Sequence, residues 1–467
     1  MNPAASRLVE SRGRWGYAAA ILVLCLVQLR VGWEIAGQIN HNPDEFDQGA
    51  YIQMAQRMQS SWYPWYPDGT RNPLLPWLAA RFLDPSAPDF LEKAKLFNVV
   101  LGALGTGILG WFFGRRMGPL AAWNATAISA LAVVLPTSTF FGAETLFFVL
   151  FLLLFACGMR LLTQNPLGLY AAFGVFAAAA YLTKPSATPF LALFFFFSLL
   201  RLLSTRLPLP ALWSAPDWRP RNLLVGVVIF SALYGVLISP RLQYAQRTWG
   251  SAFYSLPSFW FWADDWESCV NKYTDCRKET IARMPPAERP TLQGYFLRHS
   301  PSDAALRLAN GTGLRLRQLF HPEKRWRFPA EKKGDVRRAV LPNRGFYLIG
   351  AAALALAMGA FAWRAGVLSA PGPVGLPLLL FAATFALYAL ATGWYVPTGP
   401  GHRFILTLYL PTLWICAQGS EQLRSVARSR IADGTFLAIH AALAILLACR
   451  LVMLAAGPSF EKIAYTF

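Results

Sequence analysis

Residues 144–162, ETLFFVLFLLLFACGMRLL, decide the fold of this 467-residue chain. Between Glu144 and Arg160 the run contains no charged residue. A helix that crosses a bilayer needs about 20 mostly apolar residues. The run therefore predicts a membrane-spanning helix with a carboxylate at one end and a guanidinium near the other.

The composition of the whole chain agrees with this interpretation. Hydrophobic residues make up 55% of it and charged residues 14%, against about 25% charged in an ordinary soluble domain. So apolar a chain is neither a typical soluble domain nor disordered. Its net charge of +19 would suggest nucleic acid in a soluble protein, but cytoplasmic loops of membrane proteins accumulate Lys and Arg.

Ten further segments have the length and apolarity of a span. We predict eleven spans, at 15–33, 95–113, 119–136, 144–162, 167–183, 187–203, 222–240, 345–363, 374–394, 403–419 and 434–456. The first is expected to be an uncleaved anchor, because no small-x-small cleavage site follows it. The predicted fold class is an all-α polytopic membrane protein, a transmembrane helical bundle with extracytoplasmic loop elaborations.

The basic residues predict the orientation of the spans. Arg7, Arg12 and Arg14 precede the first span and favour a cytoplasmic N-terminus. Alternating spans then leave two long segments outside. We predict three regions: a transmembrane module over 1–240 that includes the outer loop 34–94, an extracytoplasmic region over 241–343, and transmembrane helices over 344–467.

The outer loop 34–94 should be helical. Asp47, Tyr51, Met54 and Met58 recur at helical spacing, with Asp44 as a candidate cap before them. A second helix is predicted over 74–82. We expect the apolar residues of both helices to lie on the membrane surface.

Ionisable residues gather at the span ends that the topology puts outside. They are Asp47, Glu144, Lys184, Arg241, Arg247, His402 and Arg403. Taken singly, Lys and Arg at a helix end can snorkel to the headgroups, Glu144 can complement a helix dipole, His402 can make a local hydrogen bond, and Asp44 and Glu45 can be caps. Taken together they predict an active site at the outer membrane face, because ionisable groups at membrane depth are costly and tend to be functional.

Five short motifs in this layer resemble those of GT-C membrane glycosyltransferases. DQGAYIQMA at 47–55 is similar to the Asp-Glu-x-x-Tyr-x-x-x-Ala opening of their first outer loop, and RNPLLPWL at 71–78 to its close. FGAETLF at 141–147, LTKPS at 182–186 and HRFILTLYLP at 402–411 resemble their acidic, Thr-Lys and basic-aromatic motifs. In pattern the chain is most similar to the bacterial aminoarabinose lipid A transferase and protein O-mannosyltransferase-like group.

The chain departs from that group at two positions. Gln48 replaces the usual Glu, and Arg71-Asn72 stands where aminoarabinose transferases commonly have Glu-Lys. The sequence also shows no cluster of His and carboxylates suited to zinc. The donor sugar stays open, no cofactor is predicted, and a divalent metal is left open.

The resemblance implies transfer of a sugar from a polyprenyl phosphate, such as undecaprenyl phosphate, with inversion. The acceptor is lipid A, another glycan or a protein, the expected location is the bacterial inner membrane, and the site faces the periplasm. Asp47 is the expected base, with Asp44 or Glu45 as alternatives, and Glu144 orients the acceptor or a basic partner. The expected phosphate-binding residues are Lys184, Arg247, Arg403 and Arg241. The expected supporting residues are Tyr51, Arg71 and His402.

The region 241–343 carries two further hypotheses. Cys269 and Cys276 either form a small disulfide in an oxidising compartment or stay free thiols. Trp260, Trp262 and Trp266 are interfacial anchors or surfaces on which a sugar stacks.

Two other classes of protein remain open from the sequence. The first is a secondary transporter or a flippase of lipid-linked sugars, although transporters typically place ionisable groups near the midplane, often within internal repeats. The second is a polytopic anchor without chemistry.

Overall fold

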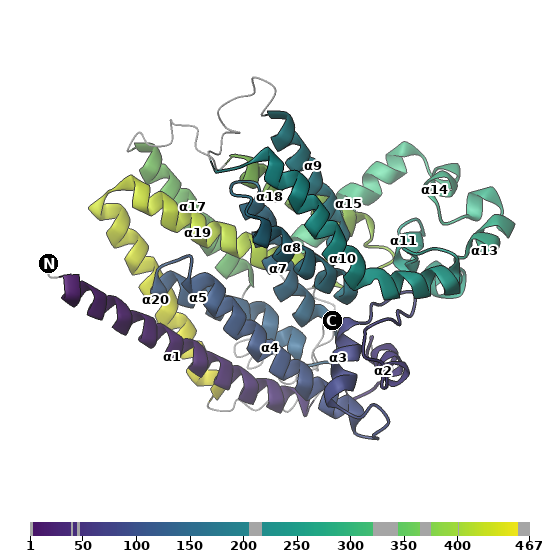
Figure 1. Ribbon diagram of the computed structural model, residues 1–467, viewed down its shortest axis with the longest axis horizontal. Coiled ribbons are helices and arrows are strands. Elements are labelled where there is room, and N and C mark those ends of the chain that lie inside the picture. The colour runs from purple at the N-terminus through teal and green to yellow at the C-terminus, as the bar shows by residue number, and fades with distance from the viewer. Residues whose placement is uncertain are drawn as a thin grey trace.

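The computed structural model describes residues 3–38, 41–43, 47–204, 217–320, 344–364, 375–399 and 401–455, with the side chains of residues 3–14 and of His402 excepted. Every regular element in these ranges is helical. The long helices form one bundle, and the short helices α11–α14 lie beside one end of it together with α15 (Figure 1).

The bundle is built from long helices with short elements between them. The first half contains α1 (Pro3–Ala36), α4 (Phe90–Gly114), α5 (Pro119–Ser129), the π-helix η1 (Ala130–Val134), α6 (Leu135–Ser138), α7 (Glu144–Leu161), α8 (Leu167–Thr183), the 3₁₀ helix η2 (Pro185–Ala187), α9 (Thr188–Ser204) and α10 (Pro220–Trp249). The second half contains α17 (Arg344–Arg364), α18 (Gly375–Trp394), the 3₁₀ helix η7 (His402–Leu408), α19 (Tyr409–Ala427) and α20 (Arg430–Ala455).

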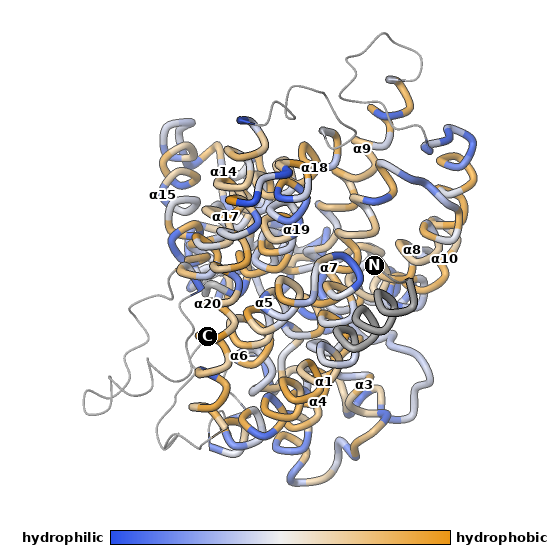
Figure 2. The backbone as a smooth tube through the Cα atoms, turned by 90° about the vertical axis from the view of Figure 1, so that its left-hand side faces the viewer, coloured by the Kyte–Doolittle hydropathy of each residue, from blue (hydrophilic) through white to orange (hydrophobic). Residues whose placement is uncertain are grey.

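Ten of the eleven predicted spans correspond to these helices. Within the described ranges, nine helical segments are long and apolar enough to cross a membrane, and α8 is a shorter apolar helix. The chain is therefore a multi-pass membrane protein. Figure 2 shows apolar residues along the long helices and hydrophilic ones mostly at their ends.

One predicted span differs in its course. Residues 403–419 were expected to be a single helix, but 402–408 wind as the 3₁₀ helix η7, and the α-helix runs from Tyr409 to Ala427. The backbone just before η7 is held by Arg315, which donates to the carbonyl oxygens of Thr392, Gly399 and Gly401. An α-helix therefore begins only after this anchored segment.

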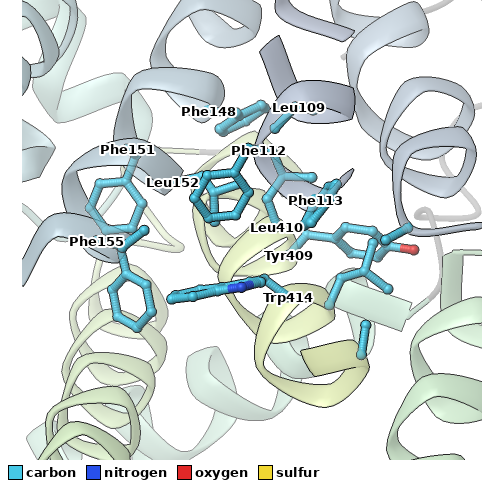
Figure 3. Packing of buried hydrophobic residues seen from close by; sticks show 14 of the residues in the cluster. Leu109, Phe112, Phe113, Phe148, Phe151, Leu152, Phe155, Tyr409, Leu410 and Trp414 are labelled. Atoms are coloured by element: carbon cyan, nitrogen blue, oxygen red, sulfur yellow. The ribbon is translucent and has the colours of Figure 1, made fainter. Parts of the chain in front are cut away.

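Helix α7, which contains the apolar run that begins at Glu144, lies in the core of the bundle. Its Phe151 and Phe155 pack against aromatic rings from α9, α18 and α19, and the Phe155 and Trp414 centroids are 6.0 Å apart. Phe112 of α4 approaches the same Trp414 at 5.5 Å (Figure 3). Because helices on several sides hold α7, its first residue, Glu144, has a fixed position.

The segment predicted to be the first outer loop forms the two predicted helices, α2 (Gln48–Arg57) and α3 (Leu74–Phe82). Asp47 is the N-cap residue of α2, and Asp44 lies outside the described residues. The expectation that their apolar faces lie on the membrane surface was wrong for several of these residues. Tyr51, Met54 and Leu75 are buried in one cluster with Phe141, because α2 and α3 pack on each other and on the end of the bundle.

The segment predicted to be extracytoplasmic, as far as the structure describes it, is a set of helices that continues from α10. These helices are α11 (Leu256–Trp260), α12 (Trp266–Asn271), α13 (Lys278–Arg283), η4 (Pro286–Glu288), α14 (Leu292–Arg298) and α15 (Pro301–Phe320). Helix α10 continues past residue 240, the predicted boundary, to Trp249, and ends at Gly250 with a left-handed φ of 71°. Residues 321–343 of the predicted region lie outside the described part.

Candidate active site

A cleft of about 660 Å³ lies where α2, the residues before α3, the α8–η2 junction and η7 meet. Its charged lining residues are Asp47, Arg71, Lys184 and Arg403. Its aromatic lining residues are Tyr51, Trp260, Trp266, Tyr395 and Phe404. Segments that are far apart in sequence thus bring charged and aromatic groups to one cavity.

Asp47 is paired through both carboxylate oxygens. Oδ1 accepts hydrogen bonds from Arg71 Nε at 2.9 Å and Nη2 at 2.6 Å, and Oδ2 accepts from Arg403 Nη1 at 2.8 Å. The Asp47 and Arg403 side chains are each 21% exposed. The carboxylate therefore faces the cleft while two guanidinium groups hold it.

Glu144 lies beneath this pair and is 1% exposed. Its Oε1 accepts from Lys184 Nζ at 2.5 Å and from Arg403 Nη1 at 3.4 Å. Arg403 therefore bridges the two carboxylates.

Two interruptions of the helical backbone position Lys184 and Glu144. Lys184 has an extended backbone (φ −149°, ψ 130°) between α8 and η2, which turns its side chain out of the helical register. The turn before Glu144 is held by Asn98, whose Nδ2 donates to Phe140 O at 2.7 Å.

The electrostatics of the cleft keep Asp47 ionised. Burial would raise the pKa of its carboxyl, but the nearby Arg403, Arg71 and Lys184 outweigh burial and hold the pKa well below its usual range. Burial and the negative charge of Asp47 together raise the pKa of Tyr51 well above its usual range. Tyr51 therefore remains a neutral phenol beside the carboxylate.

Asp68 belongs to the network but was not predicted. Its Oδ2 accepts from Arg71 Nη1 at 2.8 Å, and its Oδ1 accepts from the backbone N–H groups of Thr70 (2.7 Å) and Arg71 (2.5 Å). Gly69 between them has a φ of 92°, in the left-handed region that favours glycine. Asp68 belongs to no motif of the sequence. The only local indication of its hydrogen bonds to the backbone is the Asp-Gly-Thr composition, which is typical of a turn.

The two departures from the family pattern have structural partners. Gln48 is fully buried, and its Oε1 accepts from Phe141 N at 3.1 Å while its Nε2 donates to Asn42 O at 3.2 Å. A glutamate cannot make the second of these bonds. Asn72 is also buried, and its Nδ2 donates to Tyr181 O. Gln48 thus ties α2 to the turn before Glu144, and Asn72 ties the residues before α3 to α8.

Two predicted phosphate-binding residues do not line the cleft. Arg241 is buried, and its guanidinium donates to Ala252 O and Tyr254 O, both at 2.8 Å. Arg247 is exposed on α10. Arg241 is thus engaged in fixing the turn after α10, because the carbonyls of that turn take up its donors. Asp44, Glu45 and the side chain of His402 lie outside the described part.

Cys269 and Cys276 lie in one buried cluster. They are free thiols in the structure, which therefore shows no disulfide between them. Burial raises the pKa of each thiol to about 12. At neutral pH both are therefore protonated.

The tryptophans of this region have different surroundings. Trp260 and Trp266 line the cleft, with ring centroids 5.7 Å apart. Trp262 packs instead on Trp394 at 5.9 Å. Two of the three are therefore available to a molecule in the cleft. Across the described ranges, no group of three or more His, Cys, Asp or Glu is placed to hold a metal ion.

No family model and no curated protein matches the chain. Among solved structures it is similar to the apo oligosaccharyltransferase of Archaeoglobus fulgidus, with 14% identity over 94% of this chain and 55% of that one and a TM-score of 0.50. A structure of the oligosaccharyltransferase AglB from the same organism, in complex with an inhibitory peptide and a dolichol-phosphate, matches with 14% identity over 95% and 56% and a TM-score of 0.45. Apo ArnT from Cupriavidus metallidurans matches with 16% identity over 85% and 77% and a TM-score of 0.34.

The likeness to the first of these structures shows the fold. The chain shares the transmembrane helical fold of this oligosaccharyltransferase, which agrees with the all-α polytopic fold class expected from the sequence. It spans little more than half the length of the oligosaccharyltransferases it matches.

Proposed function

We propose that the chain is a membrane glycosyltransferase that moves a sugar from a polyprenyl-phosphate donor to an acceptor hydroxyl. The observation that carries this proposal is the arrangement of Asp47 and Glu144 with Arg71, Lys184 and Arg403 around one aromatic-lined cleft. A carboxylate that can take a proton and cations that can hold a leaving phosphate are the two requirements of this transfer. The neighbour of the same fold is itself an oligosaccharyltransferase.

Asp47 is the base in this proposal. It takes the proton of the acceptor as the acceptor atom attacks the anomeric carbon, while the bond from that carbon to the phosphate oxygen breaks. Attack opposite the phosphate inverts the anomeric centre. Glu144 is buried behind Asp47 and does not line the cleft, so its proposed role is to hold Lys184 and Arg403 in place.

Lys184 and Arg403 are the proposed phosphate-binding residues. Both line the cleft, and their charges are balanced by carboxylates when no phosphate is bound. A donor phosphate would compete with Asp47 for Arg403. As Arg403 turns to the phosphate, Asp47 loses one of the cations that lower its pKa and becomes a stronger base. Donor binding would thus activate the base.

The aromatic wall is the proposed contact for the sugar. Trp260 and Trp266 line the cleft, and the centroid of the Phe404 ring lies 5.9 Å from Lys184 Nζ. A ring beside the phosphate-binding lysine can stack on a sugar attached to that phosphate.

We further propose that the protein lies in a bacterial inner membrane with its N-terminus in the cytoplasm and its cleft facing the periplasm. The basic residues before the first span and between later spans support this orientation. Undecaprenyl phosphate is the proposed carrier, and lipid A, another envelope glycan or a protein is the proposed acceptor.

The test uses the purified full chain in proteoliposomes loaded with a mixture of radiolabelled polyprenyl-phosphate sugars and envelope extract as acceptor. Release of free polyprenyl phosphate with label on an acceptor supports the proposal. Movement of the intact donor across the bilayer without transfer would identify a flippase instead. If all the radiolabel stayed on the donor, and the donor stayed on its original side of the bilayer, the result would contradict both activities.

A further inference from the structure

A second cavity, of about 410 Å³, lies between α5, α17, α19 and α20, and shares no lining residue with the cleft. Small side chains leave this space where the helices meet. Among its small lining residues are Ala121, Ala125, Gly350, Ala351 and Ala417.

The cavity opens sideways toward the lipid. Phe346, Ile439 and Leu446 line it and are 57%, 42% and 42% exposed on helices that belong to the bundle. A molecule dissolved in the bilayer can therefore enter without crossing the protein.

Two polar residues, Asn124 and His440, also line the cavity and are 1% and 4% exposed. Asn124 Nδ2 lies 2.9 Å from the backbone oxygen of His440 and 2.9 Å from its Nδ1. A carbonyl oxygen can only accept, so the Asn124 atom facing it is the amide nitrogen. Nδ1 is then the acceptor of the second bond, and the ring proton of neutral His440 sits on Nε2.

This arrangement leaves one acceptor and one donor unused. Asn124 Oδ1 and His440 Nε2 are buried and have no hydrogen-bond partner in the part of the chain that the structure describes. Unpaired polar groups are costly in an apolar interior, so an occupant that pairs them is stabilised there. A hydroxyl group both donates and accepts, and so matches an unused acceptor and an unused donor.

We propose that this cavity binds a lipid-soluble alcohol from the bilayer. Its hydrocarbon chain would lie among the small apolar residues, and its hydroxyl would donate to Asn124 Oδ1 and accept from His440 Nε2. A lone water has the same polar chemistry but leaves the apolar walls uncovered. The proposal does not depend on the transferase activity.

A groove elsewhere in the bundle serves as the control site for the binding experiment. A groove of about 490 Å³ between α1 and α4 is lined by apolar residues and by Cys25, whose thiol donates to Ala103 O at 3.4 Å. This groove can take a hydrocarbon chain, and in the described part of the chain none of its side chains leaves a buried polar atom without a hydrogen-bond partner.

The experiment compares two photolabels on the full chain in phosphatidylcholine nanodiscs: a hexadecanol and a hexadecane that carry the same diazirine. Labelled peptides are quantified by mass spectrometry. At the second cavity we expect the alcohol to be favoured about tenfold, since two hydrogen bonds of ordinary net strength distinguish the probes. In the α1–α4 groove we expect no preference.

Two variants separate the parts of the proposal. The double variant Asn124→Leu/His440→Phe removes both polar partners and should abolish the preference for the alcohol while hydrocarbon labelling persists. Gly350→Leu should reduce labelling by both probes, because a Cβ at Gly350 meets no atom within 4 Å and its side chain can occupy the cavity. Gly107→Leu in the α1–α4 groove, where the nearest atom is Cys25 Sγ at 4.0 Å, should leave the cavity's labelling unchanged.

Equal labelling of the cavity by alcohol and alkane in the unmodified chain would overturn the proposal and assign the polar pair to water. A preference for the alcohol that survives in Asn124→Leu/His440→Phe would overturn it as well.

Discussion

Replacing Arg403 by methionine removes the cation that the two carboxylates of the cleft share. Arg403 Nη1 lies 2.8 Å from Asp47 and 3.4 Å from Glu144. Removing one partner of a buried ion pair costs about 3–5 kcal/mol, because the remaining charge is poorly solvated. Each carboxylate here keeps a second cation, Arg71 or Lys184, so we expect a loss of about 3 kcal/mol in the free energy of unfolding.

The assay is denaturant unfolding of the purified chain in detergent micelles, with Arg403→Met, Glu144→Gln and the double variant measured together. The double variant removes Arg403 together with the Glu144 charge that Arg403→Met alone leaves poorly paired. Its loss in the free energy of unfolding should therefore be at least about 1 kcal/mol smaller than the sum of the two single losses. Arg247→Met is the matched control, since Arg247 is exposed on α10, and should change stability by less than about 0.5 kcal/mol. Losses that simply add, or an Arg403→Met variant as stable as the control, would refute the shared-cation account.

Further outcomes follow from the same network. Lys184→Ala should weaken binding of polyprenyl phosphate about tenfold or more, since a hydrogen bond to a charged group is lost, and unchanged affinity in a lipid-binding titration would exclude Lys184 from the phosphate site. Asp68→Asn should lower kcat about fivefold in the transfer assay while donor affinity changes little, because Arg71 loses an ion pair that orients it; an unaltered kcat would count against this positioning role. Gln48→Glu should destabilise the fold by about 2 kcal/mol in the same unfolding assay, because a buried donor is replaced by a charge, and equal stability would contradict it. Folding lowers the pKa of Asp47, so the ion pairs of its carboxylate stabilise the folded chain at neutral pH, and this contribution is lost as the pH falls below about 4. The Asp47→Asn variant should therefore lose less free energy of unfolding than the native chain between about pH 5 and pH 3. Parallel losses in the two proteins would argue against a lowered pKa.

Much of the fold was predictable because a membrane limits what a chain can do. Uninterrupted apolar runs specify helices of bilayer length, and the boundaries of α3 and the start of α7 were predicted to the residue. The η7 segment was not, since Arg315, which lies 84 residues before Gly399, holds the backbone there. A bond of that separation has no local signal in the sequence.

The site was predictable in part for the same reason. Asp47, Glu144, Lys184 and Arg403 stood out as charges at the outer ends of apolar runs, and the structure brings all four together. Arg241 occupies an equivalent position in the sequence but is used by the carbonyls of its own turn. Topology gives the height of a residue in the membrane, whereas the direction of its side chain depends on tertiary contacts.

Asp47 is the proposed base that takes the proton from the acceptor. The most direct measurement is a single-turnover transfer assay that compares the native chain with Asp47→Asn, with polyprenyl-phosphate binding measured in parallel. Because asparagine cannot accept the proton, transfer should fall by at least about 100-fold, while the carrier lipid binds at least as tightly, since Arg403 no longer pairs with a carboxylate at that position. Transfer by Asp47→Asn at the native rate would contradict the account.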